Sequence, residues 1–345
     1  MAQAFKRWVY FLSAVLVSGC TLVDEDLAGC ENECRIDYEL QLVTNMSAQL
    51  QTALSLETDI SVSAALHKDL QEVFTDFAHD VDLSFFDTGD SPVLLHHENH
   101  LMDGSQSSYT LHIPVRDYCH LAVANLSRVP GVMLDGSGLL GETRLHQEES
   151  DTLDSHGSSI FTARKTLEMS SDPEQTFDVN LFMANCSEVL VVDTLGSGVK
   201  DVKVFASGFA TEFLLADSLY LFSGTPVFRT RKLEPEEGES TEMCFVCVNF
   251  PSRDVEKSKM VIEVDDPEVE ESAPDPLWNF RVYATLADGT VTETLLGVRK
   301  PVQAAHLRVI KARMFPDGAA EPEDHSVGMS ITLDWSPGIE SEIDL

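Results

Sequence analysis

The chain has 345 residues, 43% of them hydrophobic, and a formal net charge of −35. This apolar content is enough to build sizeable cores, which excludes global disorder, and the length predicts two domains. The negative charge excludes nucleic acid as a natural partner, because phosphates demand a basic face, and it offers no attraction to anionic lipid.

The first twenty residues have the pattern of a bacterial lipoprotein export signal. Two cations at positions 6 and 7 precede a mostly apolar stretch over 8–17, and a Ser-Gly-Cys tripeptide ends at Cys20. Ten residues span about 15 Å as a helix, whereas a bilayer core is about 30 Å thick, so the pattern predicts a signal peptide over 1–19 and not a membrane span. Residues 17–20 resemble a lipobox, which implies cleavage between Gly19 and Cys20. An ordinary signal peptide with an incidental cysteine is the alternative.

Residues 20–35 are polar and acidic, and we interpret them as a lipidated tether. If acyl chains such as palmitate modify Cys20, they attach the protein to the outer membrane, and stable attachment takes more than one chain. Three acids at 24–26 resemble the surface-export signal of Bacteroidota lipoproteins, although a plain solvated tether is an equal alternative.

Residues 36–172 predict an N-terminal β-sandwich domain. Apolar and polar side chains alternate over several short stretches, as they do in half-buried strands. These stretches are 36–42, 81–85, 93–95, 109–115 and 118–125. Apolar residues spaced by three and four over 60–79 predict one amphipathic helix that covers a sheet. We expect a long loop over 135–159 and a domain junction near 170–174.

Residues 173–345 predict a second β-sandwich domain. The strand candidates are 177–183, 189–193, 199–205, 213–222, 244–250, 280–286, 291–298 and 327–333. Turn signals separate them at spacings that are typical of antiparallel sandwiches. Two acidic stretches, 234–239 and 265–276, predict exposed loops. The chain therefore belongs to the mainly β class, with two tandem antiparallel β-sandwich domains.

Seven cysteines occur, and six remain if Cys20 carries lipid. An exported protein meets oxidising conditions, so these six could form disulfides, with 15 pairings open. They are Cys30, Cys34, Cys119, Cys186, Cys244 and Cys247. Zinc is the alternative, because Cys30 and Cys34 and also Cys244 and Cys247 have metal-like spacing. Residues three apart on a strand point to opposite faces, which makes the second pair a poor zinc site.

No catalytic motif appears: the chain has no GxSxG, P-loop, HExxH or GxGxxG sequence. Residues 96–100, His-His-Glu-Asn-His, are the best metal candidate. We interpret them as a solvated histidine cluster in a loop, and an enzyme would need acids from elsewhere to join them. We expect no enzymatic activity, no metal and no cofactor beyond the lipid on Cys20.

Several motifs occur in the order found in one known family. A lipobox and a cysteine pair precede the first strand. Residues 81–90 are similar to a strand, Phe-Asp and turn segment, and 114–125 resemble a strand that ends in Ala-Asn, although Asp117 replaces the usual Gly. Residues 306–338 look like the closing strand and Asp-Trp-x-x-Gly motif. On these motifs the chain resembles the FimB-type fimbrial anchoring subunits of Bacteroidales.

The resemblance implies two tandem transthyretin-like β-sandwich domains and a lipoprotein of the outer membrane. It implies fimbrial subunits as partners, joined by strand exchange, in which a neighbour's strand completes an open sheet. A chain tied to lipid at Cys20 would hold the base of the fimbrium and end its assembly. The alternative function is a surface lipoprotein adhesin that binds a glycan or a host protein, for which the mature-chain tryptophans, Trp278 and Trp335, look packed instead of exposed.

Overall fold

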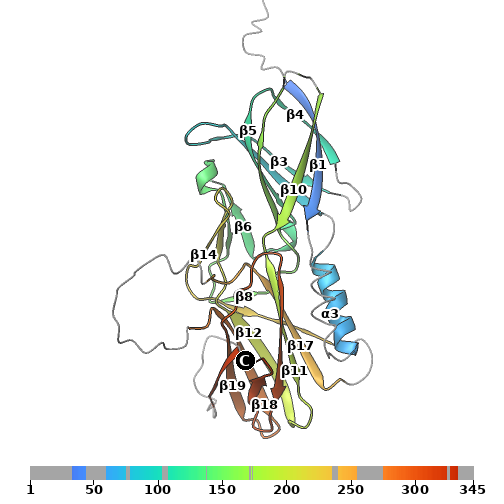
Figure 1. Cartoon of the computed structure of the whole chain (residues 1–345), viewed down its shortest axis with the longest axis vertical. Helices are drawn as coiled ribbons and strands as arrows, with labels where there is room; N and C mark the ends of the chain where they lie inside the picture. Colours follow the sequence, from blue (N-terminus) through green and yellow to red (C-terminus); the bar gives the residue numbers. More distant parts are fainter. Residues whose placement is uncertain are drawn as a thin grey trace, which may run out of the picture.

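The computed structural model describes residues 33–43, 60–74, 78–102, 108–136, 138–170, 172, 174–234, 240–254, 275–324 and 327–332. These residues form one α-helix and four β-sheets in an elongated molecule (Figure 1). The mainly β class that the sequence predicts is confirmed. Within the described residues, no helix is long and apolar enough to cross a membrane.

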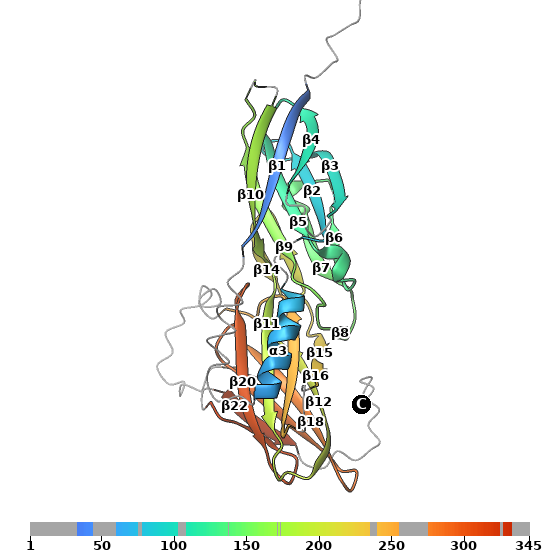
Figure 2. The same ribbon diagram turned by 90° about the vertical axis from the view of Figure 1, so that its right-hand side faces the viewer.

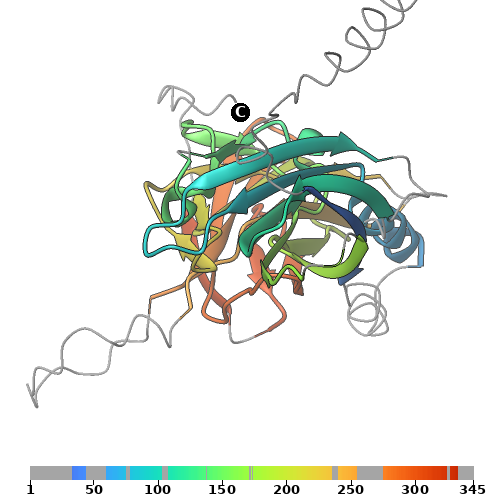
Figure 3. The same cartoon turned by 90° about the horizontal axis from the view of Figure 1, so that it is seen from above.

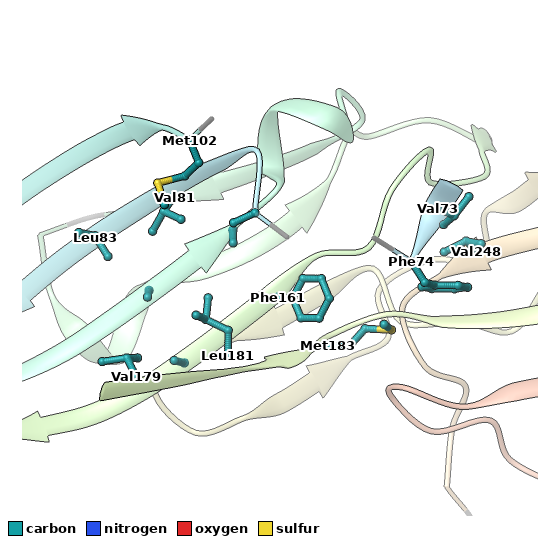
Figure 4. Close-up of a cluster of buried hydrophobic side chains, with 14 of the residues drawn as sticks. Val73, Phe74, Val81, Leu83, Met102, Phe161, Val179, Leu181, Met183 and Val248 are labelled. Carbon is teal, nitrogen blue, oxygen red and sulfur yellow. The ribbon is translucent and has the colours of Figure 1, made fainter. Parts of the chain in front are cut away.

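The largest sheet has seven strands. In spatial order they are β3 (Leu94–Leu101), β2 (Asp80–Phe86), β5 (Tyr118–Ala124), β9 (Phe161–Leu167), β10 (Glu174–Met183), β1 (Glu33–Val43) and β4 (Ser108–Pro114). Alternation buries Leu83 of β2, Leu181 of β10 and Ile113 of β4 in the same core, because successive side chains point to opposite faces. The strands therefore curve around one core, as the view from above shows (Figure 3), and part of this core is drawn in Figure 4.

Two further sheets pack face to face as a sandwich. One contains β16 (Arg231–Leu233), β17 (Glu242–Asn249), β11 (Cys186–Asp193), β20 (Leu307–Met314) and β21 (Ala320–Pro322). The other contains β22 (Val327–Thr332), β19 (Val291–Val298), β18 (Trp278–Leu286), β12 (Val199–Ser207), β15 (Val227–Arg229) and β8 (Thr152–Asp154). Leu190 of β11 and Phe280 of β18 meet in the core between the two sheets. Trp278 is fully buried there, so the sequence-based expectation for this tryptophan is confirmed.

A small sheet joins the two halves of the chain. It contains β14 (Leu219–Leu221), β13 (Glu212–Leu214), β7 (Arg144–Gln147) and β6 (Val132–Asp135), with the short 3-10 helices η2 (Leu126–Arg128) and η3 (Leu140–Glu142) nearby. Leu145 and Phe213 from this sheet share a buried cluster with Leu121 of β5 and with Phe250. The cluster fixes the seven-stranded sheet against the sandwich.

The amphipathic helix is α3 (Ile60–Val73), and its buried stripe covers a sheet as predicted. The sequence analysis assigns this helix to the N-terminal domain, and in the structure it packs on the five-stranded sheet, which later residues form. Leu66 and Leu70 of α3 share a buried cluster with Val246 of β17, and the helix lies along β17 (Figure 2). The five-stranded sheet is therefore covered on both faces, which explains why nearly all of β11 is buried.

Several other expectations differ from the structure. The stretch 135–159 is not one long loop, since it contains β7 and β8, and 213–222 is a hairpin, β13 and β14, whose turn holds Ser218 at a φ of 51°. The sandwiches are not wholly antiparallel: β1 pairs parallel with β10, β11 with β20 and β15 with β8. Residues 235–239 and 255–274, which cover most of both acidic stretches, lie outside the described residues.

The domain junction expected at 172/173 does not coincide with the boundary between sheets. β10 follows this position in the sequence but pairs with β1 and β9 of the seven-stranded sheet. The chain enters the next sheet only at Cys186. Alternation identifies a strand, but the strand that pairs with nearly all of β10 is β1, more than a hundred residues earlier, which no local pattern specifies.

Candidate functional site

The predicted lipidation site lies outside the described residues. Gly19, Cys20 and Cys30 precede the first described residue, and Cys34 lies in β1 with a side chain that is not described. Cleavage, lipidation and a disulfide at Cys30 or Cys34 therefore stay predictions. The first described residues form β1, so the predicted tether is followed directly by this strand.

The strand β1 is internal to the seven-stranded sheet. It pairs parallel with β10 from Arg35↔Glu174 to Val43↔Phe182, and antiparallel with β4 from Glu33↔Pro114 to Glu39↔Ser108. A force applied to the chain before β1 would therefore act along a strand that is hydrogen bonded on both sides. The hydrogen bonds on both sides of β1 would have to break together before the strand could be pulled out. The strand is therefore suited to bear a pulling force from the chain before it.

Four of the candidate disulfide cysteines are free thiols in the structure: Cys119, Cys186, Cys244 and Cys247. None of them is bonded to another described cysteine. Cys244 belongs to the core under α3, whereas Cys247 belongs to the core between the sandwich sheets, so the predicted placement on opposite faces of β17 is confirmed. Burial raises the pKa of the Cys244 thiol to about 12 and that of Cys247 well above its usual value.

A buried polar cluster surrounds Glu188, a residue that the sequence analysis did not single out. The Cys186 Sγ donates to Glu188 Oε1 at 3.1 Å, and Asn249 Nδ2 donates to Cys247 Sγ at 3.2 Å. Burial raises the pKa of Glu188 to about 8. The one signal in the sequence is an acid inside the apolar stretch 186–192.

The histidine cluster lies within strand β3, which corrects the expectation of a loop. His96, Glu98 and His100 share one face of the strand, and the two imidazole Nε2 atoms lie 2.6 and 2.7 Å from the two oxygens of Glu98. His97 points to the other face and lies 2.9 Å from Asp82. Burial by itself would raise the pKa of Glu98, but the hydrogen bonds and charges of His96 and His100 together outweigh it, so the pKa is lowered. Within the described part of the chain, no group of three or more His, Cys, Asp or Glu side chains is placed to hold a metal ion.

The seven-stranded sheet has two long edges, and these are the candidate sites for strand addition. β3 pairs with β2 and β4 pairs with β1, and neither has a second partner among the described strands. The start of β3 is covered, because Leu94 N donates to Gly138 O at 2.7 Å, whereas 95–99 and 109–113 have no second strand beside them among the described residues. An open edge presents N–H and C=O groups that another strand can satisfy.

The other edges are mostly too short for this purpose. β16, β21 and β8 have three residues each, and β21 ends at Pro322, which cannot donate a backbone hydrogen bond. Among the described strands of the sandwich, β22 is the one longer edge. Short strands and proline are common protections against unwanted pairing. The edge sites themselves could not be read from the sequence, because they depend on the order of strands in each sheet.

No protein-family model matches the sequence, and a search of curated proteins finds no match. A solved structure does share its fold. A candidate adhesin from Bacteroides thetaiotaomicron aligns with a TM-score of 0.50 at 8% identity, over 88% of this chain and 98% of that one. A candidate adhesin from Bacteroides ovatus gives 0.49 at 12% identity, over 93% and 100%. The fimbrial anchor protein Mfa2 from Porphyromonas gingivalis gives 0.44 at 10% identity, over 88% and 100%. At 8% identity the likeness to the first of these structures concerns the fold alone.

Proposed function

We propose that the protein is a lipoprotein of the outer membrane that anchors the base of a fimbrium on the cell surface. Acyl chains on Cys20 hold the chain at the membrane, and fimbrial subunits attach to the open edge of the seven-stranded sheet at β3 or β4. The motifs that resemble fimbrial anchoring subunits support this proposal, and so does a β fold that is shared with a candidate adhesin.

The observation that carries the proposal is the position of β1. The predicted tether leads directly into a strand that is bonded to β10 on one side and to β4 on the other. If a fibre attached at β4, its pull would reach the lipid-linked chain through the hydrogen bonds between β4 and β1. Because Cys20 is fixed, the chain before β1 cannot be donated to a further subunit, so the anchor would end the polymer and limit its length.

Replacing the lipidated residue tests the anchoring step. Cys20→Ala should release fimbriae into the culture medium, while Thr21→Ala, which keeps the cysteine, should leave them on the cells. Electron microscopy and blotting of cell and medium fractions give the readout. Fimbriae that stay fully cell-bound in the Cys20→Ala strain would refute the proposal.

Hydrogen exchange tests which edge of the protein the fimbrial subunits bind. Amides in 95–99 or 109–113 should exchange more slowly when the purified protein is mixed with fimbrial subunits, and amides in the short edge strand β16 should not change. Protection confined to the sandwich would contradict attachment at the seven-stranded sheet.

A further inference from the structure

The open edge of β3 carries a sequence that is nearly the same in both directions. Residues 95–101 are Leu-His-His-Glu-Asn-His-Leu, with Glu98 at the centre. Leucines stand three positions to either side of Glu98 and histidines two positions to either side, so only His97 and Asn99 differ. Among the described strands β3 pairs with β2 alone, and it lies at one margin of the upper half of the molecule (Figure 2). A second copy of the strand, running antiparallel, would therefore meet matching residues along its length.

The ladder with β2 shows which backbone groups of β3 point away from the sheet. Met102 N donates to the carbonyl oxygen of His79 at 2.8 Å, so residue 102 faces β2. Because backbone groups of successive strand residues point to alternate sides, 96, 98 and 100 also face β2, and 97, 99 and 101 face outward. In an antiparallel pair centred on Glu98, residues 97 and 99 of one copy would exchange hydrogen bonds with 99 and 97 of the other. Glu98 would then face its own counterpart in a non-hydrogen-bonded pair.

The exposed leucines of this edge suit such a pairing. Leu95 is 43% exposed and Leu101 is 82% exposed, the highest value among the large apolar side chains that the structure describes. In a pair centred on Glu98, Leu95 of one copy lies opposite Leu101 of the other, and the two-fold symmetry repeats the contact. Side chains directly opposite each other on antiparallel strands interact closely. The pairing would therefore remove both leucines of each copy from water.

The central glutamates weaken the contact without preventing it. Two like charges directly opposite each other destabilise a strand pair. Each Glu98 carboxylate is already bonded to His96 and His100 of its own chain, at 2.6 and 2.7 Å, so burial by a second copy would leave neither oxygen without a partner. This balance suits a reversible association.

We infer that two copies of this protein associate through β3, as an antiparallel pair centred on Glu98, to form one continuous sheet across both molecules. The pairing leaves β4 open beside β1, so each copy keeps an edge for a fimbrial subunit. The second copy is the occupant that the near-symmetry of 95–101 selects, because a strand of unrelated sequence would not match both leucines.

The direction of the strands gives the arrangement of the two tethers. β1 runs parallel to β10, and the four pairings from β10 through β9, β5 and β2 to β3 are all antiparallel, so β1 and β3 run in the same sense along the sheet. An antiparallel β3 pair therefore reverses β1 of the second copy. The two predicted tethers would lead away at opposite ends, as they would for copies on two facing membranes.

Sedimentation of the full-length protein in detergent tests the pairing. A monomer–dimer equilibrium is expected, and protein that stays monomeric up to about 100 μM would overturn the inference. Leu101→Glu should raise the dissociation constant about tenfold or more, because it places a charge opposite Leu95 twice in each dimer. The matched control is Leu195→Glu, in the turn after β11, whose side chain is 70% exposed. Neither change should unfold the protein, and equal dissociation constants for the two variants would overturn the inference.

Two changes at Glu98 test the register. Glu98→Gln removes the facing carboxylates and should lower the dissociation constant, which a loss of structure would not do. Glu98→Cys should give a covalent dimer with oxidised glutathione, because a non-hydrogen-bonded pair brings the two Cα atoms to about 4.5 Å, within reach of a disulfide. Thr110→Cys, in the open edge β4, should not. A covalent dimer from Thr110→Cys and none from Glu98→Cys would overturn the inference.

The facing-membrane arrangement rests on the proposed lipid anchor and is tested separately. Liposomes that carry the lipidated protein should aggregate, and liposomes that carry Leu101→Glu should not. Cys20→Ala protein should still dimerise in detergent, so a failure of the anchor is distinguished from a failure of the pairing. Dimers in detergent without aggregation of the liposomes would overturn the facing-membrane arrangement.

Discussion

Arg231 of β16 donates to both oxygens of Asp69 in α3, with Nη1 2.6 Å from Oδ1 and Nη2 3.0 Å from Oδ2. The pair joins positions 162 residues apart in the sequence. Burial raises the pKa of Asp69, and the guanidinium opposes that rise. A bidentate geometry fixes orientation as well as charge, so the pair sets how the helix lies on its sheet.

Removing this arginine should destabilise the protein. We expect Arg231→Met to lower the free energy of unfolding by about 2 kcal/mol, because a partly buried carboxylate loses its partner. The matched control is Arg229→Met, whose pair with Asp154 is 2.9 Å long but exposed, and which should cost less than about 1 kcal/mol. Denaturant unfolding measures both values. Equal losses would show that the pair does not hold the helix.

Glu188 should make the stability depend on pH. Its folded-state pKa of about 8 lies above its usual value, so the folded state binds more protons than the unfolded state between pH 4.5 and 8. Stability therefore falls as pH rises through this window, by at most about 1.4 kcal/mol per pH unit. Glu188→Gln should flatten the profile, because the amide stays neutral. Melting curves from pH 5 to 8 test this, and a slope as steep as in the unchanged protein would contradict it.

The buried thiols should resist alkylation in the folded protein. Cys186, Cys244 and Cys247 are buried and their pKa values are raised, so little thiolate is available, whereas Cys119 is only half buried. Among these four cysteines, iodoacetamide at pH 8 should modify Cys119 first, and all four should react in denaturant. Peptide mass mapping gives the order, and labelling of Cys244 as fast as Cys119 would be the opposite result.

The backbone of Leu277 and Trp278 passes close to Gly208, so replacing this glycine tests how tightly the sandwich is packed there. A Cβ there would lie 2.7 Å from both the carbonyl oxygen of Leu277 and the Cα of Trp278, and the φ of Gly208 is +99°. We expect Gly208→Ala to destabilise by about 3 kcal/mol, from positive φ and overpacking together. Gly289→Ala is matched in φ, at +90°, but meets no atom, and should cost only about 1 kcal/mol. Thermal unfolding that ranks the two variants equally would exclude a role for the contact.

Local features of the fold follow from local sequence. Alternation over 81–85 and 93–95 predicts a hairpin, and β2 and β3 form one. The three-residue spacing of Cys244 and Cys247 predicts opposite faces, and each thiol lies in a different core. These predictions succeed because side chains alternate along any strand, whatever its partner.

The candidate sites depend on contacts between residues that are far apart in the sequence. Whether 94–101 is an edge depends on β3 having β2 as its one described partner. The stretch 135–159 resembles a loop in sequence because its short strands carry polar residues, and pairing of β7 with β6 and β13 and of β8 with β15 makes them strands.

Residue patterns within short segments were enough to predict the β class, the faces of the strands, the buried stripe of the helix and an export signal before Cys20. The sheet that β10 joins, the packing of α3 on the five-stranded sheet and the strands that lie at the edges are known only from the folded arrangement. Alternation and helix periodicity arise between neighbours in the chain, whereas strand order and burial arise from packing between segments that are far apart in the sequence.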